Sequence, residues 1–368
     1  MNLLSQKAIS LLENMYDERT NLFSFSTKVS NGKYINDFNN PRKIRYTINV
    51  LLGLKEVSKC KGYSVAWDVE ELTSKFIAER GEEIDNYADI GLLLLLSVDV
   101  ERSIVSLLLK RISDLVESSR LLESNLQDCS WLLWGLVAAV RQGYKDVEET
   151  ARKLFKIVHD YFLDRDTLIP RYSLIWFRKN ISSFGGIAYF LRSIYEYANY
   201  FNDEYVLTIF KESVRRIIDL QGPLGEWPWL INVNNAKVLD WYPVYSVHQD
   251  SMAMLFLLPG LSNGIRECIN SVKKSYSWLL GNNQIGVPLI AEKPFFIYRS
   301  IRHKKRWKRL DRYSKSLFNQ AMRKQSHFAR IDRLEIDPEC RSYHLGWILY
   351  TWANEHQFAE FPNSSIFK

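Results

Sequence analysis

The chain has 368 residues, of which 46% are hydrophobic and 25% are charged, and its formal net charge is +7. This composition is typical of globular proteins and excludes a disordered or collagen-like chain. The segment 299–315 alone carries a charge of +8, because it contains nine basic residues and one acid, so the rest of the chain carries −1. A single basic segment argues against a surface that coats nucleic acid.

The first residues lead directly into an amphipathic pattern, without the basic and apolar regions of a signal peptide. The longest apolar run, residues 90–96, is too short to span a bilayer. The four cysteines lie far apart in the sequence and form no CxxC pair, which is typical of reduced, buried thiols. We therefore expect a cytoplasmic protein.

Helical periodicity recurs along nearly the whole chain, and two kinds of helix alternate. One kind has a single apolar stripe and a charged back, as expected of a helix on an outer surface. The other kind is apolar nearly all round, as expected of a helix that is buried on most sides. In chain order, the expected helices of the first kind cover residues 2–15, 67–80, 100–117, 145–163, 203–219 and 263–280, and those of the second kind cover 42–58, 86–98, 125–140, 182–199, 246–258 and 339–354.

Six outer helices that alternate with six inner helices predict an all-α fold, the (α/α)6 toroid. The links that follow inner helices are short, whereas four links that follow outer helices are long, at 16–41, 164–181, 220–245 and 281–338. In a toroid these long links lie at one end, the mouth, where the inner helices begin and their positive dipole ends meet. An open α-solenoid is the alternative, but its repeats have a fixed period, whereas the period here varies from about 40 residues to more than 80.

We therefore expect one domain, residues 1–368, with a basic insertion at about 282–337 over the mouth. Within this insertion, Arg302, Lys304, Lys305 and Arg306 are candidate ligands for uronate, phosphate or sulfate groups. A solvated helical face is the structural alternative, and attachment to acidic membrane lipid is a third interpretation. Nucleic acid is the weakest interpretation, because there is only a single basic patch.

The densest group of acidic, histidine and aromatic residues lies between residues 225 and 250, on one long link and the start of an inner helix. Glu226 and Asp250 are candidate proton donors or acceptors, because carboxylates that flank a sugar act as acid, base or nucleophile. The structural alternative is that Asp250 caps the helix and that the tryptophans hold the link to the core. The other candidates in this group are His248 as a further catalytic residue and Trp227, Trp229, Asp240, Tyr242, Tyr245 and Gln249 as substrate-binding residues, with the two tryptophans as the sugar platform.

Other expected inner helices also begin with polar or aromatic residues. Asp89 and Asp128 open the second and third of these helices, and each is a candidate acid or base that faces the mouth. An acid placed at a helix N-terminus for dipole reasons is an equally good explanation of each. Further candidate substrate-binding residues at helix starts are Arg45, Tyr46, Trp176, Asn180 and His344.

No metal or cofactor is predicted. Asp337, Cys340 and His344 have spacings that one helix face can share, but no second Cys/His pair accompanies them. The phosphate-binding GxGxxG and GxxxxGK[ST] patterns are absent from the sequence, as are GxSxG and the acidic motifs of terpene cyclases.

The architecture resembles the six-hairpin glycosidase-like superfamily, which includes unsaturated glucuronyl hydrolases, N-acylglucosamine 2-epimerases and polysaccharide lyases. The runs 222–229 (GPLGEWPW) and 242–250 (YPVYSVHQD) also resemble bacterial proteins found beside glycosyltransferases of polysaccharide biosynthesis. The hydrolases use two Asp residues on inner helices, for which the resemblance implies Asp89 and Asp128. The lyases use a His, Tyr, Asn and Arg set, for which it implies His248, Tyr245, Asn180 and Arg45.

These observations predict a carbohydrate-active enzyme of the glycoside hydrolase or polysaccharide lyase type, acting on an anionic or lipid-linked saccharide. The first alternative is a non-catalytic saccharide-binding or assembly protein of polysaccharide biosynthesis. The second is a terpenoid-cyclase-like toroid that lacks the usual acidic motifs. A pair of carboxylates in the mouth favours hydrolysis, whereas its absence favours binding or elimination.

Overall fold

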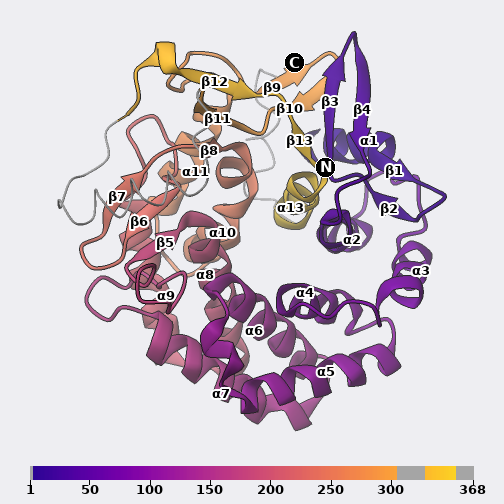
Figure 1. Ribbon diagram of the computed structural model, residues 1–368, viewed down its shortest axis with the longest axis vertical. Coiled ribbons are helices and arrows are strands. Elements are labelled where there is room, and N and C mark those ends of the chain that lie inside the picture. The colour runs from indigo at the N-terminus through magenta and orange to yellow at the C-terminus, as the bar shows by residue number, and fades with distance from the viewer. Residues whose placement is uncertain (1–2, 305–327, 354–368) are drawn as a thin grey trace.

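The computed structural model describes residues 3–304 and 328–353, and two sets of helices alternate along this part of the chain (Figure 1). The inner and outer sets agree with the sequence prediction, so the all-α toroid is confirmed. The outer helices are α1 (Leu3–Met15), α3 (Val69–Arg80), α5 (Arg102–Glu117), α7 (Glu148–Ile157), α9 (Glu204–Ile218) and α11 (Glu267–Leu279), and the inner helices are α2 (Lys43–Ser58), α4 (Tyr87–Ser97), α6 (Leu126–Arg141), α8 (Phe184–Phe201), α10 (Met254–Ser262) and α13 (Ser342–Trp352).

The inner helices form a closed ring. From α2 to α10 each packs against the next in chain order, and α13 packs against both α2 and the π-helical turn η4 (His248–Met252) that leads into α10. The closure between α13 and α2 is tight, because a Cβ atom on Gly346 would lie 2.5 Å from the carbonyl oxygen of Asn49. Since the last inner helix packs against the first, the open solenoid is excluded.

Three of the inner helices begin at a residue whose side chain caps the helix N-terminus. Asn86 and Asn125 precede α4 and α6, and their side-chain oxygens accept hydrogen bonds from the backbone N–H groups of Asp89 at 3.0 Å and Asp128 at 3.1 Å. Ser183 caps α8 in the same way. These caps set the first turns of three inner helices at one end of the ring, so the side chains there face a common space.

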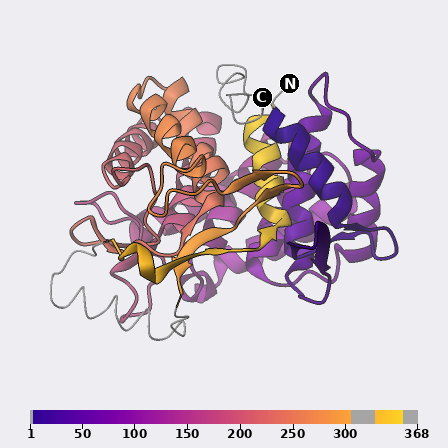
Figure 2. The same ribbon diagram turned by 90° about the horizontal axis from the view of Figure 1, so that it is seen from above.

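The long links contain short strands that the sequence analysis did not predict. Strands β11 (Ser300–His303) and β12 (Leu334–Asp337) run across one end of the helical ring (Figure 2). They form the sheet β12-β11-β8, and the other three-stranded sheets are β13-β3-β4 and β5-β6-β7. The remaining strands are β1 (Tyr16–Asp17), β2 (Leu22–Phe23), β3 (Ser26–Ser30), β4 (Lys33–Asp37), β5 (Ile181–Ser183), β6 (Leu230–Asn232), β7 (Lys237–Asp240), β8 (Val244–Tyr245), β9 (Ile290–Glu292), β10 (Phe295–Ile297) and β13 (Cys340–Arg341).

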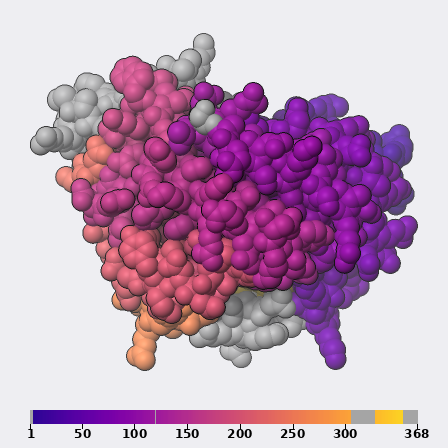
Figure 3. All heavy atoms as spheres, turned by 90° about the horizontal axis from the view of Figure 1, so that it is seen from below, coloured from indigo at the N-terminus to yellow at the C-terminus, as the bar shows by residue number. Residues whose placement is uncertain are grey.

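The core lies between the two rings of helices. Nearly all buried hydrophobic side chains form one cluster, which includes the fully buried Trp227, Trp278, Trp347 and Trp352. Seen from below, residues from the middle of the chain form a continuous outer wall (Figure 3). Within the described ranges, no helix is both long and apolar enough to span a bilayer.

Candidate functional site

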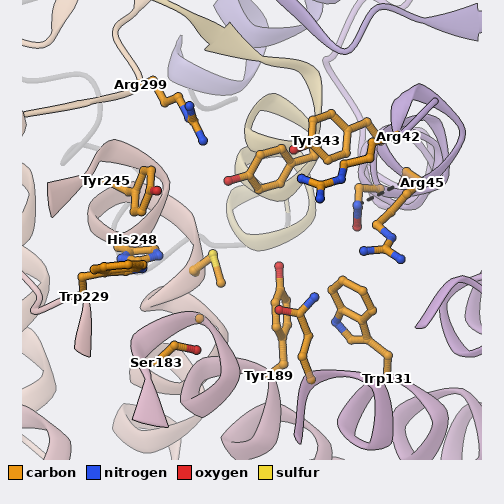
Figure 4. A pocket seen from close by; sticks show the side chains of 15 residues that line it. Arg42, Arg45, Trp131, Ser183, Tyr189, Trp229, Tyr245, His248, Arg299 and Tyr343 are labelled. Carbon is orange, nitrogen blue, oxygen red and sulfur yellow. Dashed lines mark hydrogen bonds between the residues drawn. The ribbon is translucent and has the colours of Figure 1, made fainter. Parts of the chain in front are cut away.

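A pocket of about 270 Å³ opens at the end of the toroid where the inner helices begin (Figure 4). Residues from five of the six inner helices or the turn before them reach it, together with two residues from the long links and two from the strands. The lining residues are Arg42, Arg45, Tyr46, Asn49, Gln127, Trp131, Ser183, Gly185, Tyr189, Trp229, Tyr245, His248, Met252, Arg299 and Tyr343. The structure therefore brings together five predicted site residues: Arg45, Tyr46, Trp229, Tyr245 and His248.

Three guanidinium groups line the pocket, and two of them, those of Arg45 and Arg299, are ion-paired with acids outside its lining. Arg42 and Arg45 come from the start of α2, and Arg299 reaches the pocket from the opposite side, between β10 and β11 (Figure 4). No carboxylate is among the lining residues. Because a guanidinium group forms paired hydrogen bonds to carboxylate, phosphate and sulfate, this pocket suits an anionic ligand.

Aromatic rings form much of the remaining wall. Trp131 and Tyr189 meet edge to face with ring centres 4.8 Å apart, and Tyr46 and Tyr343 lie 4.6 Å apart. Trp229, which is only partly buried, exposes its ring on the other side of the pocket (Figure 4). Flat apolar faces between polar groups are well suited to stacking against sugar rings.

Two carboxylates lie beside the pocket at the entrances of neighbouring inner helices. Asp89 is buried and ion-paired with Arg45, which itself lines the pocket. Asp128 follows the lining residue Gln127 and is partly exposed. Burial raises the pKa of Asp128 to about 6, the nearby charge of Asp89 adds to this effect, and Arg45 opposes it. At neutral pH and below, Asp128 thus keeps its proton more readily than an ordinary carboxyl.

His248 and Tyr245 stand together on the side of the pocket opposite Arg45 (Figure 4). Their rings meet edge to face with centres 5.1 Å apart, and Phe184 packs against the other side of the imidazole at 4.7 Å. Burial, together with the nearby His344, lowers the pKa of His248 to about 3. The imidazole is therefore neutral at physiological pH, so it is a weak base and a good hydrogen-bonding group.

Two acidic residues at the end of β12 and just after it hold Arg299 in place. Its Nη1 lies 3.3 Å from Oδ2 of Asp337 and 3.5 Å from Oε2 of Glu339, and its guanidinium carbon lies 5.3 Å from the centre of the Tyr245 ring. Arg302 shares Asp337 with Arg299, with its Nη1 2.6 Å from Oδ2 of Asp337, and its Nε lies 2.8 Å from Oε1 of Glu335. Arg302, predicted as an anion ligand, is thus neutralised by an internal carboxylate.

The rest of the predicted basic patch is only partly described. Lys304 is exposed, and its backbone N–H donates to the carbonyl of Arg333 at 2.9 Å. Lys305 and Arg306 lie outside the described residues.

The two acids proposed first from the sequence, Glu226 and Asp250, do not line the pocket. Both are fully buried. Glu226 lies beneath the turn at Gly222, and burial raises its pKa to about 7. Asp250 accepts a hydrogen bond from Nε2 of His344 at 2.7 Å inside the core, so these two residues bind each other there.

Other predicted substrate-binding residues have structural positions. Trp227 is fully buried and its indole N–H donates to Ser275 at 2.9 Å, so its ring packs in the core and is not available as a sugar platform. Asp240, Tyr242 and Gln249 are likewise buried behind the pocket. Trp176 is 81% exposed on a turn outside the pocket. The backbone of Asn180 anchors the same turn, because its carbonyl accepts from Val233 at 3.0 Å.

Several lining residues were missed from the sequence. Arg299 was counted in the basic segment but was not assigned to the site, and Trp131 was noted only as part of an apolar helix. Asn49, Gln127 and Trp131 lie in the first two turns of inner helices, so a search of those turns for polar and aromatic residues would have found them. The same search also finds Tyr189, which is the sixth residue of α8. Within the described ranges, no group of three His, Cys, Asp or Glu residues is arranged to hold a metal ion.

Neither a protein-family model nor a curated protein matches this chain. Solved structures do match it. A sugar epimerase from a ruminal bacterium is 12% identical, with a TM-score of 0.64 over 95% of this chain and 97% of its own. A possible member of the GH105 family from Salmonella enterica is 12% identical, with a TM-score of 0.59 over 98% and 93%. An unsaturated glucuronyl hydrolase from Bacillus sp. GL1, responsible for the degradation of glycosaminoglycan, is 14% identical, with a TM-score of 0.55 over 95% and 93%.

At these identities the likeness shows the fold alone, which is the (α/α)6 toroid. The matched proteins include both a hydrolase and an epimerase. The fold therefore leaves the reaction open, and the argument for a reaction has to come from the site itself.

Proposed function

We propose that this protein is a carbohydrate-active enzyme that hydrolyses an acidic saccharide bound in the central pocket. The observation that carries the proposal is the pair Asp89 and Asp128, which lie at matching positions of two adjacent inner helices beside Arg45. Glycoside hydrolysis generally uses two carboxyl groups whose environments push their pKa values apart. Asp128, with its pKa raised to about 6, is suited to donate a proton, and Asp89, which is ion-paired with Arg45, is placed to accept one.

In this mechanism Asp128 gives its proton to the glycosidic oxygen as the bond to the anomeric carbon breaks. Water adds to that carbon, and Asp89 takes up the proton that the water loses. This division of roles replaces Glu226 and Asp250, which lie behind the pocket wall. We assign the orientation of the substrate to His248 and Tyr245, because a neutral imidazole and a phenol both offer hydrogen bonds to sugar hydroxyls.

The charge of the pocket supports an acidic substrate. Arg42 and Arg299 face the pocket from opposite sides, and the Trp229 ring is positioned to stack on a sugar between them. The segment 282–337 contributes Arg299 and pairs with β8 beside Tyr245, which supports its proposed place over the mouth. A lipid-linked acidic saccharide of polysaccharide biosynthesis, handled in the cytoplasm, fits this pocket within the same proposal.

The test is turnover of uronate-containing oligosaccharides, measured as release of reducing ends. Asp128→Asn should lower kcat/KM by about 10²- to 10⁴-fold, the range expected for loss of a general acid. In the wild type, kcat/KM should fall as pH rises through about 6, because Asp128 then loses its proton. Glu226→Gln is the matched control, since this acid also has a raised pKa but is fully buried, whereas Asp128 is partly exposed next to the lining residue Gln127.

Equal losses of activity in Asp128→Asn and Glu226→Gln would contradict the assignment of the proton donor. Binding of the oligosaccharide without turnover by the wild type would favour the non-catalytic saccharide-binding alternative. The two variants are compared once their circular dichroism matches that of the wild type, so that a loss of activity does not reflect unfolding.

One observation favours elimination as a second candidate reaction. The guanidinium of Arg299 lies 5.3 Å from the Tyr245 ring, where it can stabilise both a uronate carboxylate and a phenolate. Elimination would create a carbon–carbon double bond, which is detected by its ultraviolet absorption. Loss of this product in Tyr245→Phe but not in Asp128→Asn would favour elimination over hydrolysis.

A further inference from the structure

An exposed aromatic turn projects from the link between the π-helical turn η3 (Val158–Phe162) and strand β5. Its three consecutive apolar residues Ile175, Trp176 and Phe177 have exposed fractions of 43%, 81% and 40%. The two rings meet edge to face with centres 5.6 Å apart. Leaving three adjacent large apolar side chains in water is unfavourable, and soluble surfaces rarely do so without a function.

The stem of this turn is held firmly by the rest of the protein. The carbonyl of Tyr172 accepts from the N–H of Leu126 at 2.9 Å, and the carbonyl of Asn180 accepts from Val233 at 3.0 Å. Within the turn, the N–H of Arg178 donates to the carbonyl of Ile175 at 2.8 Å. The apolar side chains are therefore presented on a braced support, which lowers the entropic cost of binding through them.

Two cations accompany the aromatic residues. The guanidinium carbon of Arg178 lies 5.5 Å from the centre of the Phe177 ring, and Lys179 follows on the exposed side of the turn. Together, residues 175–179 form what we call the 175–179 tip. Aromatic residues flanked by Arg and Lys are typical of segments that enter the interface of a bilayer, where rings sit among headgroups and cations pair with anionic lipid.

The tip lies at the mouth end of the toroid. It follows the C-terminal end of the outer segment α7–η3 and leads through β5 into α8, whose first turn supplies Ser183 and Gly185 to the pocket. Its stem also contacts the beginning of α6, through Leu126. A flat partner that touches the tip would thus stand in front of the pocket.

We propose that the 175–179 tip docks the protein on a bilayer that contains anionic lipid, with the mouth of the toroid turned towards the membrane. Trp176 and Phe177 enter the headgroup layer, and Arg178 and Lys179 pair with lipid phosphates. The interaction concerns a surface outside the pocket and does not depend on which reaction the pocket performs.

The test is co-sedimentation with vesicles of phosphatidylcholine alone or of phosphatidylcholine mixed with phosphatidylglycerol. The wild type should bind the anionic vesicles at least tenfold more tightly, and added salt should weaken this binding. The double variant Trp176→Ala/Phe177→Ala should lose at least tenfold in partitioning. Tyr205→Ala is the matched control, because Tyr205 is a large ring that is 64% exposed on α9, outside the 175–179 tip.

A second measurement locates Trp176 directly. Brominated lipids in the anionic vesicles should quench part of the tryptophan fluorescence of the wild type, and this part should disappear in Trp176→Phe, which keeps an apolar ring in the tip. The proposal is overturned if anionic vesicles are not bound or if the double variant binds them as well as the wild type. It is also overturned if Tyr205→Ala loses as much binding as the double variant, or if the tip variants lose saccharide binding but keep vesicle binding.

Discussion

Glu226 offers a stringent test of the electrostatics behind the pocket. Its carboxyl is fully buried against the backbone at Gly222, on the far side of the loop that presents Trp229 to the pocket. Burial raises its pKa from 4.5 to about 7. Glu226→Gln keeps the shape of the side chain and removes the ionisation, so any change in the pH dependence of stability reports on this one group.

The sign of the effect follows from proton binding. In the unfolded chain Glu226 ionises near pH 4.5, whereas in the folded protein it keeps its proton up to about pH 7. Between these values the folded state binds more protons, so its stability falls as pH rises. Each pKa unit corresponds to about 1.4 kcal/mol, so ionisation of Glu226 lowers the free energy of unfolding of the wild type by about 3 kcal/mol by pH 8.

The assay is urea unfolding of the wild type and Glu226→Gln at pH 4 and at pH 8. The free energy of unfolding should be similar for both at pH 4, whereas at pH 8 the variant should be more stable by about 3 kcal/mol. Asp128 also loses its proton in this range, but it does so in both proteins, so the difference between them isolates Glu226. A difference that is the same at both pH values would refute the reasoning.

Two further predictions concern packing and the division between core and pocket. Gly346→Ala should destabilise the fold by about 1–3 kcal/mol or more, because the new Cβ would lie 2.5 Å from the carbonyl oxygen of Asn49 where the ring closes. Urea unfolding measures this loss, and an unchanged midpoint would contradict the tight closure. Trp227→Ala should lower the free energy of unfolding by about 3–5 kcal/mol and leave the saccharide affinity of the folded protein unchanged. Trp229→Ala should weaken saccharide binding with little loss of stability. Unfolding experiments measure the stability of each variant, and calorimetric titration measures its saccharide affinity.

The helical architecture was predictable because each helix carries its own periodic signal. The stretch from Leu92 to Leu96 is apolar all round and proved to be inner, whereas the charged back of α7 marks an outer helix. The strands were not predictable, because segments of two to five residues are too short to show alternation. Their pairing depends on contacts between distant segments, such as β13 with β3.

The site was only partly predictable for a different reason. Glu226, Trp227 and Trp229 lie within four residues, and the sequence does not show which of them faces the pocket. In the structure Trp227 and Glu226 turn inward and Trp229 turns to the cavity. Arg299 is 254 positions from Arg45 in the sequence, so only the fold brings the two cations to one pocket.

The two explanations offered for Asp89 and Asp128 need not compete. Each acid lies three residues after a capping asparagine, and Asn125 donates from its Nδ2 to Oδ2 of Asp128 at 2.8 Å. The cap thus satisfies the helix terminus and at the same time fixes the carboxyl at the mouth. The two acids differ in their surroundings: Asp89 is ion-paired with Arg45, whereas at Asp128 burial outweighs the more distant charge of Arg45 and raises the pKa to about 6. In the proposed mechanism, two similar helix caps therefore supply a proton donor, Asp128, and a carboxyl that Arg45 holds in place, Asp89, which is the division of roles that acid–base hydrolysis requires.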